Sequence, residues 1–217
     1  MIAAAPITTD DAAREWLAAK FAPTPAQWAA LELYAQMLRA ASLQQNLVAA
    51  STLDTLWARH IADSAQLLCL DVRDGEGLWL DLGSGAGLPG LVAAILSERR
   101  VLLVESRGLR CRFLEEVIAA TGLSARAAVA AIPLKHVPTQ DAATISARAF
   151  ASLDTLLNLS ARFSTASTRW LLPKGRNAVK ELALLPASWQ KLFHVEHSCT
   201  DNESGIIVGT GTAKDWR

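Results

Sequence analysis

The sequence predicts an α/β protein in which a mostly parallel β-sheet carries helices on both faces and is preceded by an N-terminal helical extension. Two observations support this prediction. After residue 77, short apolar runs alternate with helical segments, as expected for parallel strands joined by crossover helices. Before residue 77, apolar side chains recur at helical spacing and no strand pattern appears.

The N-terminal part is expected to contain three helices. An acidic pair at residues 10–11 begins the first helix. Thr24 caps the second, and Pro25 takes its first helical position, where the missing N–H costs little. Ser51 or Thr52 is expected to cap the third helix, because a hydroxyl can accept a hydrogen bond from the first helical turn.

A polar turn at residues 72–76 marks the one boundary that the sequence suggests. We therefore assign residues 1–75 to the helical extension and residues 76–217 to the main domain. Apolar runs that read as strands and amphipathic segments that read as helices alternate through that domain. The strands are expected at residues 77–82, 101–105, 142–147, 169–172 and 205–209, and the helices at 88–97, 109–120, 152–162 and 176–185.

The composition excludes several classes of protein. The chain has 217 residues, of which 51% are hydrophobic and 19% charged, so it is too apolar for a disordered chain. The longest apolar runs, such as residues 88–96, reach about half of a bilayer span, and residues 1–6 lack the basic region of a signal peptide. Three widely spaced cysteines match no disulfide framework or metal site. We therefore expect a cytoplasmic protein without a membrane span.

The formal net charge is zero, with a pI near 6.9, which argues against a protein that coats nucleic acid by bulk charge. The charge is unevenly divided. Residues 1–75 contain eight acidic and five basic side chains, whereas residues 76–217 contain thirteen acidic and sixteen basic ones. Both a local basic face on the second part and an ordinary mixed surface agree with these numbers.

The most informative segment is the glycine-rich turn at residues 81–90, which reads DLGSGAGLPG. It follows the first predicted strand and opens a helix. Gly83 and Gly85 allow positive φ angles and a close approach of a ligand to the backbone. The free N–H groups at the start of the helix attract anionic or electron-rich atoms. The turn therefore predicts a cofactor site.

Two cofactor classes use such a turn. The dinucleotide fingerprint needs a small residue at the sixth position counted from Gly83, and this chain has Leu88 there. The G-x-G-x-G form after Asp81 instead resembles the S-adenosylmethionine turn of class I methyltransferases. Glu105, at the end of the second predicted strand, is placed to accept hydrogen bonds from both ribose hydroxyls of either cofactor.

Further motifs extend the resemblance along nearly the whole chain. They are NL at residues 46–47, WARHIADS at 57–64, RCRFL at 110–114, SARAFASL at 146–153 and LPKG at 172–175. Together with the glycine turn they resemble the bacterial small-subunit ribosomal RNA guanine-N7 methyltransferases, also called the glucose-inhibited division protein B family. The LPG extension of the turn and the ARAFASL block are far more specific than a generic cofactor loop.

The resemblance implies a class I, Rossmann-like methyltransferase that uses S-adenosylmethionine to methylate N7 of a guanosine in 16S ribosomal RNA. The implied partner is 16S RNA or the small ribosomal subunit, and we expect a monomer. The resemblance also implies that Gly83 and Leu88 line the methionine and ribose side of the cofactor. It places Arg148 at the cofactor and acceptor pocket, and makes Lys174 a substrate-side cation.

The sequence departs from the family pattern at two places. The family contacts the adenine through the backbone at an Arg-x-Glu segment, which here reads AAIPL at residues 130–134. The aligned contacts are then expected at Ile132 and Pro133, although proline supplies no N–H. The second departure lies at residues 203–207, which lack the arginine that the family often has before its last strand.

The implied chemistry needs no catalytic acid or base. Guanine N7 has an exposed lone pair and no proton, so transfer requires an in-line approach of N7 to the methyl group. No base–nucleophile pair stands out in the sequence. We therefore expect Arg148 and Lys174 to hold RNA phosphates or base edges rather than to move protons.

Three other activities stay open at this level: a methyltransferase for another RNA position or a small molecule, an inactive adenosylmethionine-binding module, and a nicotinamide oxidoreductase, which Leu88 disfavours.

His60 is equally compatible with a structural hydrogen bond and with a place in the pocket wall. The arginines of the segment after Glu105 form either a phosphate track or a solvated helix face, namely Arg107, Arg110 and Arg112. Cys111 is expected to be buried filler.

Overall fold

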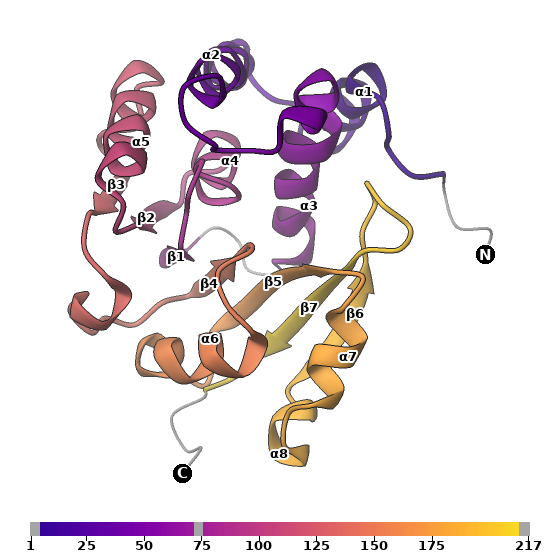
Figure 1. The fold of residues 1–217 in the computed structure, drawn as a ribbon, viewed down its shortest axis with the longest axis vertical. Coiled ribbons are helices and arrows are strands. Elements are labelled where there is room, and N and C mark those ends of the chain that lie inside the picture. Colours follow the sequence, from indigo (N-terminus) through magenta and orange to yellow (C-terminus); the bar gives the residue numbers. More distant parts are fainter. Residues whose placement is uncertain (1–4, 72–75, 213–217) are drawn as a thin grey trace.

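The computed structural model describes residues 5–71 and 76–212, and its centre is a seven-stranded sheet with the order β3-β2-β1-β4-β5-β7-β6 (Figure 1). Strands β1 to β5 are parallel, and β7 is antiparallel to both of its neighbours. The predicted mostly parallel sheet is confirmed. The strands are β1 Leu78–Leu82, β2 Arg100–Val104, β3 Ala127–Ala130, β4 Thr144–Ala147, β5 Arg169–Gly175, β6 Phe193–His197 and β7 Gly205–Thr210.

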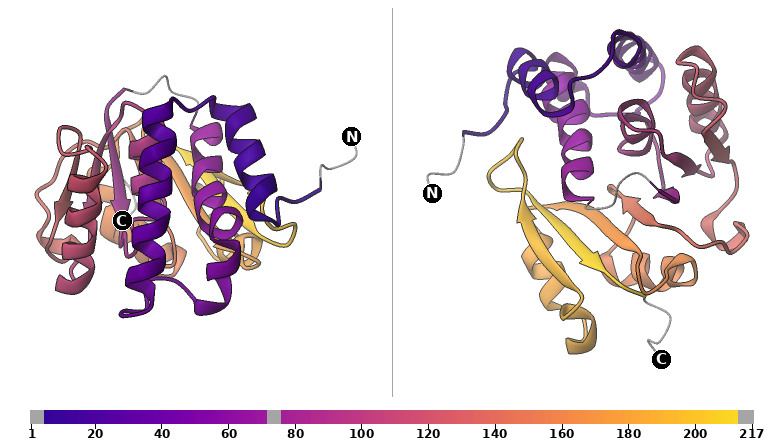
Figure 2. Two further views of the ribbon diagram at one scale, coloured as in Figure 1. Left: turned by 90° about the horizontal axis from the view of Figure 1, so that it is seen from above. Right: turned by 180° about the vertical axis from the view of Figure 1, so that it is seen from behind.

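Helices cover both faces of the sheet. One face carries α1 to α5 and the other carries α6 to α8 (Figures 1 and 2). Each helix layer packs on the sheet through its own cluster of buried apolar side chains. The helices are α1 Asp10–Phe21, α2 Pro25–Ser42, α3 Asp63–Leu70, α4 Gly90–Leu96, α5 Gly108–Ala120, α6 Leu153–Ser160, α7 Ala178–Ala183 and α8 Ala187–Gln190. None of the helices in the described part of the chain is both long and apolar enough to cross a membrane.

The first two predicted helices are confirmed, but the single capped helix expected from Ser51 or Thr52 is wrong. The segment is a 3-10 turn over Ala50–Thr55, then a π-helical turn over Trp57–Ala62, then α3. Neither hydroxyl caps it. Instead, the Asp10 carboxylate from α1 accepts the N–H groups of Trp57 and Ala58 at 2.9 and 3.1 Å.

Two strands lie outside the apolar runs from which strands were predicted. These are β3, which is alanine-rich, and the edge strand β6, which contains two histidines and a glutamate. Alanine and charged residues have weak strand preference, and both segments become strands by pairing with a neighbour already in place. The other predicted strands and helices are confirmed with shifts of a few residues at their ends.

The N-terminal helices share one hydrophobic core with the sheet. Leu17 and Leu31 belong to the same buried cluster as Leu91 and Phe113 from helices α4 and α5. Packing of this extent brings the N-terminal helices against the glycine turn. Part of the predicted boundary, residues 72–75, lies outside the described residues.

Candidate active site

Two cavities open at the carboxyl ends of the central strands, where ligands collect in parallel sheets. The larger, of about 660 Å³, lies between the N-terminal segment, the glycine turn and the ends of β4 and β5. The smaller, of about 220 Å³, lies between the end of β2 and the segment after β3. Gly83, Arg110 and Ala149 line both cavities, so the two are adjacent.

The three positive-φ glycines of the turn serve different purposes. A Cβ at Gly83 would lie 2.3 Å from the Phe150 ring, and one at Gly87 would lie 2.2 Å from Leu91, so packing excludes a side chain at both positions. At Gly85 the nearest atoms are 3.7 Å away. These are ordinary van der Waals distances, and Gly85, with φ +56, lines the larger cavity, where a glycine lets a ligand approach the backbone.

Glu105 holds the turn as well as facing the smaller cavity. One carboxylate oxygen accepts the N–H of Gly85 at 3.1 Å, and the other accepts the N–H groups of Ser106 and Arg107 at 2.7 and 2.9 Å. The side chain is 7% exposed and lines the smaller cavity. A carboxylate has about four lone-pair sites, so the three accepted N–H groups leave about one site for a ribose hydroxyl. The bond to Gly85 was not evident from the sequence, since it joins positions twenty residues apart.

The walls of the smaller cavity are apolar on the side away from Glu105. Ile132, Leu134 and Phe150 line it, which suits a flat heterocycle. Pro133 lines neither cavity, and its carbonyl oxygen accepts the N–H of His136 at 2.8 Å. Of the two adenine contacts expected from the resemblance, only Ile132 lies at the site.

Leu88 lines the larger cavity beside the turn and is 5% exposed. Asp81, which precedes the turn, is fully buried within β1. Burial raises the pKa of its carboxyl to about 6, although the Ser146 hydroxyl, which donates to it at 2.6 Å, favours the ionised form. Asp81 lines neither cavity. It contacts the glycine turn through its main-chain oxygen, which accepts a hydrogen bond from the Ser84 hydroxyl at 3.0 Å.

Arg148 follows β4 and lines the larger cavity, where two residues of the N-terminal segment hold it. Its Nη2 lies 2.7 Å from His60 Nδ1, and its Nη1 donates to the Asp63 carboxylate at 3.3 Å. His60 is buried and also lines the cavity, so both of the roles considered for it apply. The sequence motifs around these residues lie far apart, and only the fold brings them together.

Lys174 also lines the larger cavity, but its ammonium group is already paired. It donates to the main-chain oxygen of Ala151 at 2.6 Å and lies 3.0 Å from the Glu181 carboxylate. Glu181 in turn accepts the N–H of Leu153 at 2.9 Å. The Lys174 side chain is 9% exposed. The structure thus ties the loop from Ala151 to Leu153 to β5 and α7, whereas the sequence suggested a free cation.

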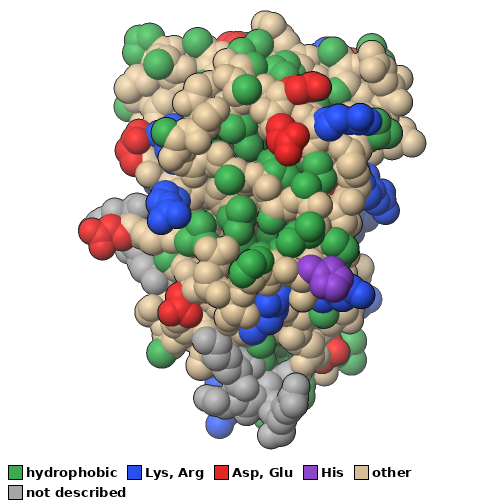
Figure 3. All heavy atoms as spheres, turned by 90° about the vertical axis from the view of Figure 1, so that its left-hand side faces the viewer, with side chains coloured by type: hydrophobic (Ala, Val, Ile, Leu, Met, Phe, Trp, Pro, Cys, Tyr) green, Lys and Arg blue, Asp and Glu red, His purple; other side chains and the backbone are tan. Residues whose placement is uncertain are grey.

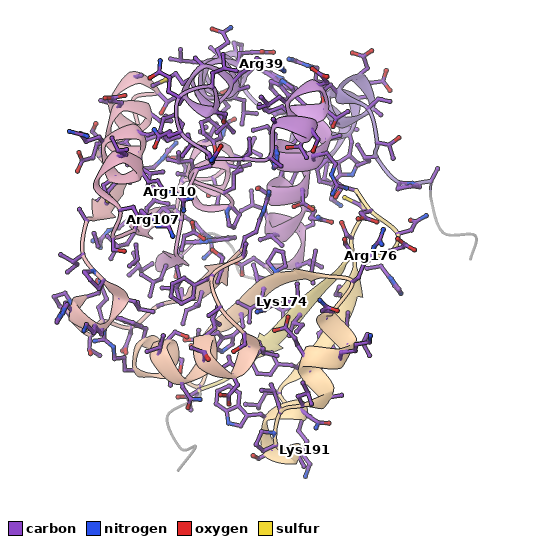
Figure 4. The ribbon with its side chains drawn as sticks, in the orientation of Figure 1. Arg39, Arg107, Arg110, Lys174, Arg176 and Lys191 are labelled. Carbon is purple, nitrogen blue, oxygen red and sulfur yellow. The ribbon has the colours of Figure 1, made fainter. Side chains whose placement is uncertain are left out.

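The arginines after Glu105 differ from one another. Arg110 lies between the cavities, 3.8 Å from Glu105, and donates to the Asn46 carbonyl at 3.4 Å. Arg107 and Arg112 are exposed, and Arg107 lines the smaller cavity at the start of α5 (Figure 4). Figure 3 shows the side of the molecule that is on the left in Figure 1, where basic and acidic side chains are interspersed around a hydrophobic band. No single sign of charge dominates that face.

Two minor candidates do not join the site. Cys111 is buried and donates from its thiol to the Glu105 carbonyl at 3.3 Å. The other candidate is the pair His194 and His197, whose short spacing in the sequence invites a metal-site reading, and both side chains are exposed on β6. Within residues 5–71 and 76–212, no cluster of three or more histidine, cysteine or acidic side chains could hold a metal ion.

The fold has solved counterparts with low sequence identity. One is a precorrin-6Y C5,15-methyltransferase from Geobacter metallireducens, with 14% identity, TM-score 0.52 and coverage of 69% of this chain and 87% of that one. Another is a ribosomal protein L11 methylase from Lactobacillus delbrueckii, with 16% identity, TM-score 0.51 and coverage of 69% and 79%. The likeness to these two proteins shows that the chain has the fold of class I methyltransferases, with the glycine turn and the Glu105 carboxylate at the carboxyl ends of its strands.

Closer relatives identify the family. The model of the rRNA small subunit methyltransferase G family, GidB, matches residues 27–205. A ribosomal RNA small subunit methyltransferase G from Sphingopyxis alaskensis is 65% identical over 97% of this chain and 90% of its own. One from Erythrobacter litoralis is 49% identical over 96% and 99%. The chain belongs to the rRNA small subunit methyltransferase G family.

Proposed function

We propose that this chain transfers a methyl group from S-adenosylmethionine to N7 of a guanosine in 16S ribosomal RNA. The observation that carries the proposal is that the two cavities are adjacent and share Gly83 of the glycine turn, Arg110 and Ala149 in their walls. The smaller cavity offers a carboxylate and apolar walls for an adenosine, and the larger one offers Arg148 beside the turn. Family membership supports the same reaction.

S-adenosylmethionine supplies an electrophilic methyl group on its sulfonium when bound. The residues of this chain then have to hold the two reactants in line. Gly83, Gly85 and Leu88 form the wall against the methionine and ribose side, Glu105 accepts a hydrogen bond from the ribose through its remaining lone pair, and Ile132 contacts the adenine. Guanine N7 carries no proton, so the site needs no general base, and orientation and exclusion of water account for catalysis.

Arg148 is the residue that orients the acceptor. Two of its five N–H groups bind His60 and Asp63, which leaves three without a partner in the described part of the chain. A guanidinium donating to guanine O6 holds the base and leaves the N7 lone pair free. The nearby Asp63 carboxylate compensates the positive charge that N7 acquires in the product. Lys174 acts on the substrate side through the loop it holds.

The proposal extends to the setting of the enzyme. Residues 1–75 form a helical extension that completes the wall of the acceptor cavity, and residues 76–217 form the methyltransferase domain. The protein acts as a cytoplasmic monomer on 16S RNA or on the small ribosomal subunit. The interspersed charges in Figure 3 agree with recognition by a local site rather than by bulk charge.

The test is methyl transfer from labelled S-adenosylmethionine to small subunits and to 16S RNA from a strain that lacks this protein. Borohydride reduction followed by aniline cleavage marks 7-methylguanosine, and cleavage at one labelled position is expected. Label at a different position or on another molecule would replace the acceptor in our proposal. Cofactor binding without any transfer would reduce the protein to a binding module.

A further inference from the structure

We infer that Thr52 and His60, from the segment that precedes the methyltransferase domain, are positioning residues that hold the Arg148 guanidinium in one orientation at the acceptor cavity. The inference rests on the proposed function for the identity of the acceptor, but not for the hydrogen-bond geometry. All three side chains line the larger cavity. A series of hydrogen bonds links them and ends at the Ala49 carbonyl.

The positions of the protons in this series of hydrogen bonds follow from its two end groups, the Arg148 guanidinium and the Ala49 carbonyl. A guanidinium can only donate, so His60 Nδ1, 2.7 Å from Arg148 Nη2, must present a lone pair. The proton of the neutral ring is then on Nε2, which donates to the Thr52 hydroxyl at 2.7 Å. The Thr52 hydroxyl in turn donates a hydrogen bond to the Ala49 carbonyl oxygen at 2.6 Å. This is the one arrangement in which each of these donors has an acceptor.

The opposite tautomer and the protonated form of His60 are incompatible with this series of hydrogen bonds. In the opposite tautomer, or in the imidazolium, an N–H at Nδ1 would face an N–H of Arg148. Burial, together with the nearby charges of Arg148 and Arg59, lowers the pKa of His60 to about 3. The ring therefore stays neutral at physiological pH, and Arg148 at Nδ1 and the Thr52 hydroxyl at Nε2 together fix the proton on Nε2.

A second contact holds the guanidinium from the side. Asp63, three residues after His60 and on the same helical face, accepts from Arg148 Nη1 at 3.3 Å. The other oxygen of Asp63 accepts from the Thr200 hydroxyl at 2.8 Å and from the Gln66 amide at 2.9 Å. Because both partners of Arg148 are themselves held, the remaining guanidinium N–H groups have a defined direction.

The kinetic test compares Thr52→Val with Thr52→Ser. Valine has nearly the shape of threonine but cannot accept a hydrogen bond from His60 Nε2, so one of the two groups that fix the tautomer is lost and only Arg148 remains. We expect kcat for subunit methylation to fall by about tenfold, because misplacement of an orienting group is costly, with the Kd for S-adenosylmethionine within about twofold of wild type. Serine keeps the hydroxyl and is expected to recover most of the loss. Thr55→Val, on the same 3-10 turn but outside the cavity lining, is the matched control.

The second readout is ¹⁵N NMR of the histidine rings, which does not depend on methyl transfer. His60 should show an unprotonated Nδ1 and a protonated Nε2 at every pH from 8 to 5. In Thr52→Val the two nitrogens of His60 should exchange their assignment in part.

Three results would overturn the inference: a protonated Nδ1 in the wild type, an unchanged kcat in Thr52→Val, or an equal loss in Thr52→Val and Thr55→Val. Failure of the wild type to methylate 16S RNA would contradict the proposed function instead. The NMR result would then still decide whether His60 holds Arg148 in the predicted tautomer.

Discussion

The phenol of Tyr34 donates a hydrogen bond of 2.9 Å to the main-chain oxygen of Ala86, and so connects α2 directly to the glycine turn. Tyr34 is fully buried, and burial raises the pKa of its hydroxyl, which stays protonated as the donor. Ala86 lies one residue after Gly85, where the cofactor backbone contact is proposed. The N-terminal helices therefore support the cofactor site as well as the acceptor cavity.

Tyr34→Phe should lower both stability and cofactor affinity. The substitution keeps the ring but leaves the buried Ala86 carbonyl without its donor, which costs about 1–3 kcal/mol of unfolding free energy. The turn also loses a support, so the Kd for S-adenosylmethionine should rise severalfold. Urea unfolding and calorimetric titration measure the two effects. A stability loss with an unchanged Kd would show that the turn does not need this support.

Gly85→Val should abolish cofactor binding while the protein still folds. The φ of +56 costs a non-glycine residue about 1–2 kcal/mol, and the branched side chain would project at a position that lines the larger cavity. We expect a loss of affinity on the order of 100-fold or more, which is about 2.7 kcal/mol. Isothermal titration with S-adenosylmethionine measures it.

Gly122→Val is the matched control for that experiment. Gly122 has φ +72, and no described atom lies within 4 Å of the position of its Cβ, so it carries similar backbone strain without a cavity. The control should lose comparable stability and retain the affinity for S-adenosylmethionine. Equal effects of both variants on affinity would remove Gly85 from the cofactor site.

Glu105→Gln should weaken cofactor binding and the turn together. An amide has one acceptor oxygen where the carboxylate has two, so the N–H of Gly85 or those of Ser106 and Arg107 lose their partner. We expect a loss of about 1.5–3 kcal/mol in binding of S-adenosylmethionine. RNA affinity measured without cofactor should change little, and a parallel loss of RNA affinity would make Glu105 a general structural residue.

Lys174→Ala should impair methylation by releasing a loop rather than by removing a phosphate contact. The ammonium is paired with Glu181 and the Ala151 carbonyl, so the loss of about 1–3 kcal/mol appears in stability and in kcat. The salt dependence of RNA binding should stay almost the same. Double substitution with Glu181→Gln should cost less than the sum of the single effects, as measured by urea unfolding. Additive losses would argue against the pairing.

Arg107→Ala is expected to behave in the opposite way. Its side chain is exposed at the smaller cavity beside α5, whereas Lys191 lies on the far end of the molecule after α8 (Figure 4). If Arg107 contacts a phosphate, its removal lowers the salt slope of RNA binding by about 0.7–0.9, and Lys191→Ala leaves the slope unchanged. Filter binding across a salt series measures both. Equal small changes in the two variants would assign Arg107 to the solvated helix face.

The sequence by itself predicted the mostly parallel sheet, most of its helices and the cofactor turn, but not the strands β3 and β6. Apolar periodicity and caps such as Thr24 act over one or two turns of chain, so their structural effect can be predicted without knowing the neighbours. The glycine turn, with Glu105 about twenty residues later, works in the same way. The third N-terminal helix was predicted wrongly because its cap, Asp10, arrives from another helix.

The tertiary structure decided what the charged side chains do. Arg148 and His60 are 88 residues apart in the chain, and Lys174 pairs with both a carboxylate on α7 and a carbonyl in the loop before α6. Whether a cation is free for RNA or committed to a protein partner depends on which groups the fold brings within hydrogen-bond distance. The local sequence does not predict these pairs, because long polar side chains bind the groups that are near them in space, whatever their spacing along the chain.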